Sequence, residues 1–143
     1  MATTTEHYDL LFAPVEAEVG ALGEDTYTGI VGFSGGGPVS LCKARQANLV
    51  VTCELSLYPE QIVSAEGLRY ELLTRLPISV SEAQTLLTAL GNLSMQATLG
   101  DGHTIDVSGL LDAGGMNSVR LRRYSSITID DNQCGIYEVV GCD

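Results

Sequence analysis

Two alternating runs of hydrophobic and polar residues between Asn48 and Pro77 form the clearest pattern in the chain. In the first run, five alternate positions share one face of a predicted strand: Leu49, Val51, Cys53, Leu55 and Leu57. In the second run, one face carries Leu68, Tyr70, Leu72 and Leu76, and the other carries Arg69, Glu71, Leu73 and Arg75. A short connection separates the runs, so we expect the two strands to pair.

One later segment has the pattern of an amphipathic helix. Ser79 and Glu82 stand at the spacing of a capping box. Four apolar residues then recur at helical intervals: Ala83, Leu86, Leu87 and Leu90. We predict a helix over residues 80–90, ended by Gly91.

The rest of the chain favours strands. We predict them at residues 8–12, 26–33, 39–43, 92–99, 103–107, 119–129 and 135–140. Gly100-Asp101-Gly102 predicts a hairpin turn. Residues 15–25 favour a loop or a short helix, because Val15, Val19 and Leu22 have helical spacing but glycines interrupt them.

These elements indicate a single α+β domain over residues 1–143. We expect a mostly antiparallel or mixed β-sheet, covered by one clear helix at about 80–90 and, as an open alternative, by a second short helix. The sequence shows neither an internal repeat nor a change of composition that would mark a second domain.

The chain is strongly acidic, with 18 acidic and 7 basic residues and a formal net charge of −11. This charge repels phosphate backbones and anionic lipid surfaces, so we predict neither a nucleic-acid nor a membrane partner. The segment from Met1 to His7 lacks the basic flank and apolar core of a secretion signal. We therefore expect a cytoplasmic protein.

Four cysteines are spaced unlike a zinc knuckle or a Cys-x-x-Cys redox motif: Cys42, Cys53, Cys134 and Cys142. We expect them to be reduced, with Cys53 as a small buried hydrophobe. A bond between Cys134 and Cys142 stays an open alternative. No metal site or cofactor is predicted.

One segment matches a catalytic motif letter by letter. Residues 32–36 read Gly-x-Ser-x-Gly, with Ser34 at the position of the nucleophile. His103 is a candidate base, and Asp101 or Asp106 a candidate orienting carboxylate. The motif requires a strand before it and a helix after it, whereas a proline and a predicted strand follow here. A small Ser/His/Asp enzyme is therefore the alternative to a binding protein.

Three of the seven cations lie within four residues, at Arg120, Arg122 and Arg123. Arginine binds carboxylates through two parallel hydrogen bonds, so the cluster suits either an acidic strip on a partner or acidic neighbours within the chain. The candidate partner-binding residues are Glu54, Arg69, Glu71, Arg120, Arg122 and Arg123. The alternative is that the arginines pair internally, with residues such as Glu54 and Glu71, or are solvated.

The order of short motifs resembles a suppressor of fused domain of a short bacterial type. Leu49-Val50-Val51-Thr52 is followed by Leu55-Ser56 and then by Arg69-Tyr70-Glu71-Leu72-Leu73, which ends at Leu76-Pro77. Similar features are Leu86-Leu87 within a helix, the turn Asp101-Gly102-His103-Thr104-Ile105, and Ile136-Tyr137-Glu138-Val139 in a closing strand. A tryptophan that the family often places after the Leu-Pro step is missing here.

The resemblance implies a protein-binding module without catalytic activity. Animal relatives bind Gli-type transcription factors, and bacterial relatives are thought to be immunity proteins that neutralise toxins. An acidic surface would speed the encounter with a basic partner of this kind. A homodimer of structural role, joined through a sheet edge, is a further alternative.

Overall fold

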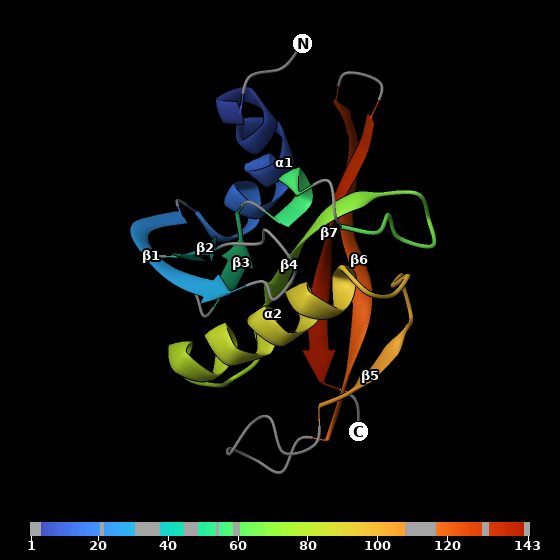
Figure 1. Cartoon of the computed structure of the whole chain (residues 1–143). Coiled ribbons are helices and arrows are strands. Elements are labelled where there is room, and N and C mark those ends of the chain that lie inside the picture. The colour runs from blue at the N-terminus through green and yellow to red at the C-terminus, as the bar shows by residue number, and fades with distance from the viewer. Residues whose placement is uncertain are drawn as a thin grey trace.

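The computed structural model describes residues 4–20, 22–30, 38–44, 49–53, 55–58, 61–107, 117–129 and 132–141. Within these ranges, one sheet of seven strands lies against two α-helices (Figure 1). The helices are α1 (Thr4–Val19) and α2 (Val80–Ser94), with a 3-10 turn η1 (Leu55–Leu57). The strands are β1 (Leu22–Ile30), β2 (Pro38–Ala44), β3 (Val50–Thr52), β4 (Arg69–Thr74), β5 (Thr104–Asp106), β6 (Ser118–Ile129) and β7 (Asn132–Gly141). The predicted α+β class is confirmed.

The sheet is mixed, with the strand order β1-β2-β3-β4-β7-β6-β5. Neighbouring strands are antiparallel except β4 and β7, which are parallel. The predicted pairing of the two alternating runs is confirmed, because Val51 of β3 lies opposite Leu73 of β4. The strands predicted over residues 119–129 and 135–140 are also confirmed, as the antiparallel pair β6 and β7.

The two helices cover opposite faces of the sheet. Leu72 of β4 belongs to the apolar cluster that contains the buried face of α2, and Leu73 belongs to the cluster that contains Leu11 and Val15 of α1. Successive residues of a strand point to opposite faces, so each helix closes its own side. Burial on both sides explains why every residue of β4 after Arg69 is buried.

Helix α2 begins as predicted, with Ser79 as its N-cap and Glu82 completing the capping box. The helix does not stop at Gly91 but continues to Ser94. The predicted strand over residues 92–99 and its hairpin are therefore wrong, and β5 pairs with β6 instead. Leu93 packs against the core beyond Leu90, and this burial offsets the low helix propensity of the glycine, which costs roughly 1 kcal/mol.

The predicted strand over residues 8–12 is also wrong, because these residues lie inside α1. Leu11, Phe12 and Val15 are buried on one side of the helix, with Val19 half-buried next to them. This spacing is helical, but Pro14 within the segment conceals it from sequence reasoning. The second helix is thus longer than expected and begins earlier.

The first alternating run forms only the three residues of β3 and then turns into η1. Val50, Val51 and Thr52 are all buried, so the strand has no exposed polar face. The hairpin predicted from residues 26–33 and 39–43 is confirmed as β1 and β2. The glycine-rich segment with Ser34, together with Glu54, Asp130 and Asp131, lies outside the described residues.

The expectation that the cysteines are reduced is wrong for one pair, because Cys42 and Cys53 are joined as a disulfide. The antiparallel register of β2 and β3 sets Cys42 opposite Val51, and the two cysteine Cα atoms lie 6.7 Å apart. This spacing is within the range that a disulfide spans. Cys134 is a buried free thiol, and Cys142 lies outside the described residues.

Candidate functional site

Glu71, in the middle of β4, is fully buried and accepts four hydrogen bonds. Its Oε1 accepts the Thr52 hydroxyl at 2.6 Å and the backbone N–H of Leu55 at 3.0 Å. Its Oε2 accepts the backbone N–H of Ser56 at 2.7 Å and the hydroxyl of the same residue at 2.5 Å. The carboxyl group therefore holds the turn η1 against β4. We call Glu71 with Thr52, Leu55 and Ser56 the Glu71 cradle.

Burial raises the pKa of Glu71 to about 7, against the opposing effect of these four hydrogen bonds. A neutral carboxyl fits the cradle, because its proton can be donated to a hydroxyl of Ser56 or Thr52 while both oxygens still accept the backbone N–H groups. Glu71 is thus a structural group that does not reach the surface.

Two further contacts tie the same segments together. The backbone N–H of Leu72 donates to Thr52 Oγ1 at 2.8 Å. Arg69 Nε donates to the carbonyl of Ser56 at 3.0 Å, and Arg69 Nη2 donates to the carbonyl of Tyr58. The arginine and the glutamate of one strand therefore bind the two ends of the same turn.

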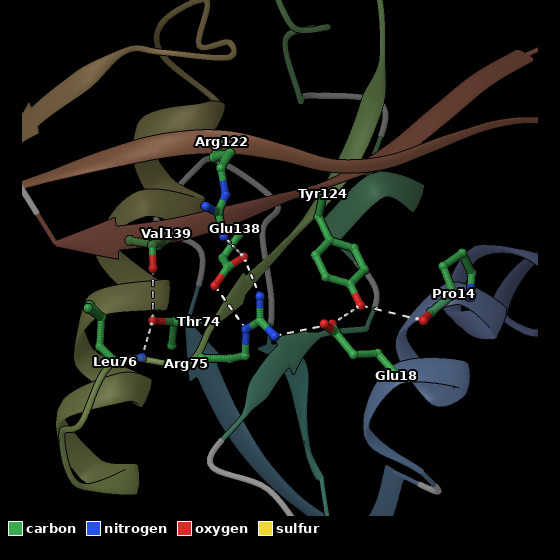
Figure 2. Close-up of polar contacts among 9 residues, drawn as sticks. All are labelled: Pro14, Glu18, Thr74, Arg75, Leu76, Arg122, Tyr124, Glu138 and Val139. Carbon is green, nitrogen blue, oxygen red and sulfur yellow. Dashed lines mark hydrogen bonds and ion pairs between the residues drawn. The ribbon is translucent and has the colours of Figure 1, made fainter.

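A second polar network lies on the α1 face, where α1, β4, β6 and β7 meet (Figure 2). Arg75 donates two hydrogen bonds to the carboxylate of Glu138, one of 3.0 Å from Nε and one of 2.9 Å from Nη2. Its Nη1 pairs with Glu18 of α1 at 3.1 Å. Tyr124 donates to Glu18 at 2.5 Å, and the guanidinium carbon of Arg75 lies 5.8 Å from the centre of the Tyr124 ring. Arg75 therefore links α1 to the sheet.

Glu138 is shared between two arginines, since Arg122 Nη2 also approaches its Oε1 at 2.7 Å. The Glu138 side chain is 6% exposed, whereas that of Arg122 is 59% exposed. Burial raises the pKa of Glu138, but the hydrogen bonds from Arg75 and Arg122 outweigh it and lower the pKa below its usual value. Glu138 therefore stays ionised near neutral pH.

The structure separates the candidate partner-binding residues into interior and surface groups. Glu71 is buried and Arg69 is half-buried, both in the cradle region. Arg120, Arg122 and Arg123 are exposed on β6. The internal partner that the structure gives Arg122 is Glu138, and Glu54 lies outside the described residues.

The candidate catalytic residues that the structure describes are all exposed. His103 is exposed, and Asp101 Oδ1 accepts the backbone N–H of Arg123 at 2.8 Å. Asp106 is exposed on β5. Among the described residues, no group of three or more His, Cys, Asp or Glu side chains is arranged to hold a metal ion. Nor is any described helix long and apolar enough to cross a membrane.

Sequence reasoning missed a third cluster, centred on Tyr137. Its hydroxyl lies 2.8 Å from Ser64 Oγ and 2.5 Å from Glu66 Oε1. Glu66 Oε1 also accepts the backbone N–H of Asp101 at 2.9 Å, so the cluster binds the loop around Glu66 to the turn before β5. Burial, followed by the hydrogen bond to Glu66, raises the pKa of Tyr137. The only sequence signal was a tyrosine on the apolar face of a strand.

We compared the chain with protein-family models, with curated proteins and with solved structures, and none of the three comparisons gives a match.

Proposed function

We propose that this chain is a non-enzymatic protein-binding module of the suppressor of fused type, and that it neutralises a basic protein partner such as a toxin. The observation that supports this most is the Glu71 cradle. The motifs that carry the resemblance include Leu49-Val50-Val51-Thr52 with Leu55-Ser56, and Arg69-Tyr70-Glu71-Leu72-Leu73. In the fold, hydrogen bonds from Thr52, Leu55 and Ser56 to Glu71 join these segments into one unit.

A shared structural role explains why these residue types occur together. A buried carboxyl needs donors, and two backbone N–H groups of a tight turn with two hydroxyls supply them. Losing either segment would leave the other with unpaired polar groups in the core. Two things therefore support the resemblance: the order of these motifs along the chain, and the hydrogen bonds that join them in the fold.

The surface charge supports binding in preference to catalysis. A net charge of −11 on 143 residues favours the encounter with a basic protein, by roughly ten- to a thousandfold in association rate at low salt. The described members of the alternative enzyme site are His103, Asp101 and Asp106, and all three are exposed. One oxygen of Asp101 accepts a hydrogen bond from the backbone N–H of Arg123.

The test is affinity capture from a lysate of the native cell at low and at high salt, with captured proteins identified by mass spectrometry. An unrelated protein of similar size and net charge, immobilised in the same way, is the control. We expect one basic protein to be retained in stoichiometric amount at low salt and released at high salt, and to rebind as a purified protein. Absence of such a protein in every growth condition would refute the proposal.

A further inference from the structure

The Cys42–Cys53 disulfide joins strand β2 to the Glu71 cradle. Cys42 lies within β2, and Cys53 is the first residue after β3. Thr52, immediately before Cys53, donates its hydroxyl to Glu71. Leu55, two residues after Cys53, donates its backbone N–H to the same carboxyl group. The disulfide therefore holds the chain at the point where it passes from β3 towards the turn η1.

Strand pairing already holds β2 and β3 together without a cross-link. The two strands are antiparallel, and their pairing reaches Thr52, which lies opposite Leu41. In the folded chain, the disulfide adds a constraint on Cys53, which lies beyond this last pair. The additional constraint therefore acts on the direction in which the chain leaves β3.

We propose that Cys42 and Cys53 form a redox switch that controls the turn η1. In the oxidised chain, the disulfide holds η1 against Glu71. In the reduced chain, η1 opens and closes locally while the sheet stays folded. Each opening uncovers the carboxyl group of Glu71 and the side chain of Leu55, which are both fully buried in the closed turn. This inference goes beyond the proposed function and does not depend on it.

The contacts of the sheet explain why loss of the bond acts on the turn first. Helices α1 and α2 each close an apolar cluster on their own side of the sheet. A chain of 143 residues buries enough surface in such clusters to fold without a cross-link, which much smaller domains often need. The pairing of β3 with β4 reaches only to Val51, so hydrogen bonds of the Glu71 cradle join the following segment to β4.

The two cysteines differ in exposure, and this difference decides where reduction begins. Cys42 is half-buried and Cys53 is 8% exposed, so the thiolate of a small thiol attacks Cys42 Sγ. The bond between the two Sγ atoms breaks, and Cys53 leaves as a thiolate. A second small thiol then attacks the mixed disulfide and frees Cys42. Each leaving thiolate takes up the proton that the attacking thiol has lost, so the chain gains two electrons and two protons. The small thiol leaves as its own disulfide, which restores the bond by the reverse steps.

A third cysteine in the same region does not take part in this exchange. Cys134 belongs to the same apolar cluster as Cys53, and Cys42 packs against that cluster. Cys134 is a buried free thiol, and burial raises its pKa. Because the thiolate is the reactive form, a buried thiol of this kind is a poor nucleophile. Cys134 therefore offers a matched control for the switch.

The test is amide hydrogen exchange of the full chain, followed by NMR at increasing urea concentration. One sample is equilibrated with oxidised glutathione and the other with dithiothreitol, and maleimide labelling confirms the thiol state of each. Exchange that is independent of urea reports local opening, whereas exchange that rises with urea reports global unfolding. In the reduced chain, we expect urea-independent exchange of the Leu55 and Ser56 amides, faster by roughly tenfold or more than in the oxidised chain. Freeing the backbone of one residue changes an opening equilibrium by about this factor. Amides of the β6–β7 pair should keep urea-dependent exchange in both samples.

Two variants separate the switch from other effects of the thiols. Cys134→Ala removes a thiol from the same cluster and leaves the pair intact, so the response of Leu55 and Ser56 to dithiothreitol should persist. Cys42→Ala removes the bond, so its turn amides should exchange as in the reduced chain with or without dithiothreitol.

Two results would overturn the inference. In the first, the Leu55 and Ser56 amides of the reduced chain keep urea-dependent exchange and speed up by the same factor as those of β6 and β7. The disulfide would then stabilise the whole fold without controlling the turn. In the second, Cys42 and Cys53 stay reduced in oxidised glutathione. Neither result involves a protein partner, so a failure here is distinct from a failure of the proposed function.

Discussion

Replacing Glu71 by glutamine tests whether the buried carboxyl group is protonated in the folded state near neutral pH. A protonated Glu71 donates its proton to a hydroxyl and still accepts both backbone N–H groups of Leu55 and Ser56. A glutamine has one oxygen, so its amide group must face one of these two N–H donors. We therefore expect Glu71→Gln to lower the free energy of unfolding by roughly 1–3 kcal/mol at pH 5.5.

The pKa of Glu71 fixes how this difference changes with pH. Burial raises the pKa from 4.5 to about 7, so between these values the folded state holds a proton that the unfolded state has lost. Stability from this residue is fully present below pH 4.5 and is lost as the pH rises through 7. The total loss is about 3 kcal/mol, of which about 2 kcal/mol falls between pH 5.5 and 8.

Urea denaturation at intervals from pH 5.5 to 8 measures the effect, with the difference between the unmodified chain and Glu71→Gln isolating this residue from every other carboxylate. The range stays above the isoelectric point of about 4.3, where association is favoured. We expect the advantage of the unmodified chain to shrink by about 2 kcal/mol across this range. A difference that is constant with pH would refute the reasoning, because it would mean that Glu71 is ionised throughout.

Three further predictions concern the contacts between elements. Arg75→Gln leaves the buried Glu138 with Arg122 alone and should lower the free energy of unfolding by about 2–3 kcal/mol. This is less than for a fully buried ion pair, because the Arg75 side chain is 31% exposed. Unchanged hydrogen exchange in α1 would contradict the role of Arg75 as the link to that helix. Gly135→Ala places a Cβ 2.7 Å from the carbonyl oxygen of Ser125 and 2.8 Å from Leu68 Cδ1. Thermal unfolding should therefore show a free energy of unfolding lower by about 1–3 kcal/mol. An unchanged melting temperature would show that β6 moves away from the new Cβ without cost. Reduction of the Cys42–Cys53 disulfide opens a link across 11 residues and should lower the free energy of unfolding by about 3 kcal/mol. Reaction of both thiols with a maleimide before any reductant is added would show that the disulfide is absent.

The sequence correctly predicts features that depend on residues close together in the chain. It does not predict the contacts between distant segments. The capping box of α2 and the two faces of β4 depend on residues a few positions apart, so the pattern of the chain reveals them. Glu71 meets donors 15 to 19 residues away, and Arg75 meets Glu138 across 63 residues. Spacing in the sequence carries no record of such pairs, since only the order of strands brings them together.

The two wrong strand predictions have a common physical cause. Short apolar segments at residues 8–12 and 92–99 were assigned without knowledge of what covers the sheet. In the fold, Pro14 and Gly91 lie within helices whose apolar sides pack on the sheet, and tertiary burial overrides their low helix propensity. The arginines of β6 were recognised from sequence, but the division that puts Arg122 on one face and Arg123 on the other came from the register.

The most direct test is affinity capture from the native cell's lysate, with the chain and an unrelated protein of similar size and net charge immobilised side by side. We expect the chain to retain one basic protein in stoichiometric amount at low salt and to release it at high salt, and we expect the unrelated protein to retain none of it. Failure of the chain to retain any protein in stoichiometric amount would contradict the central claim, that this protein acts by binding another protein.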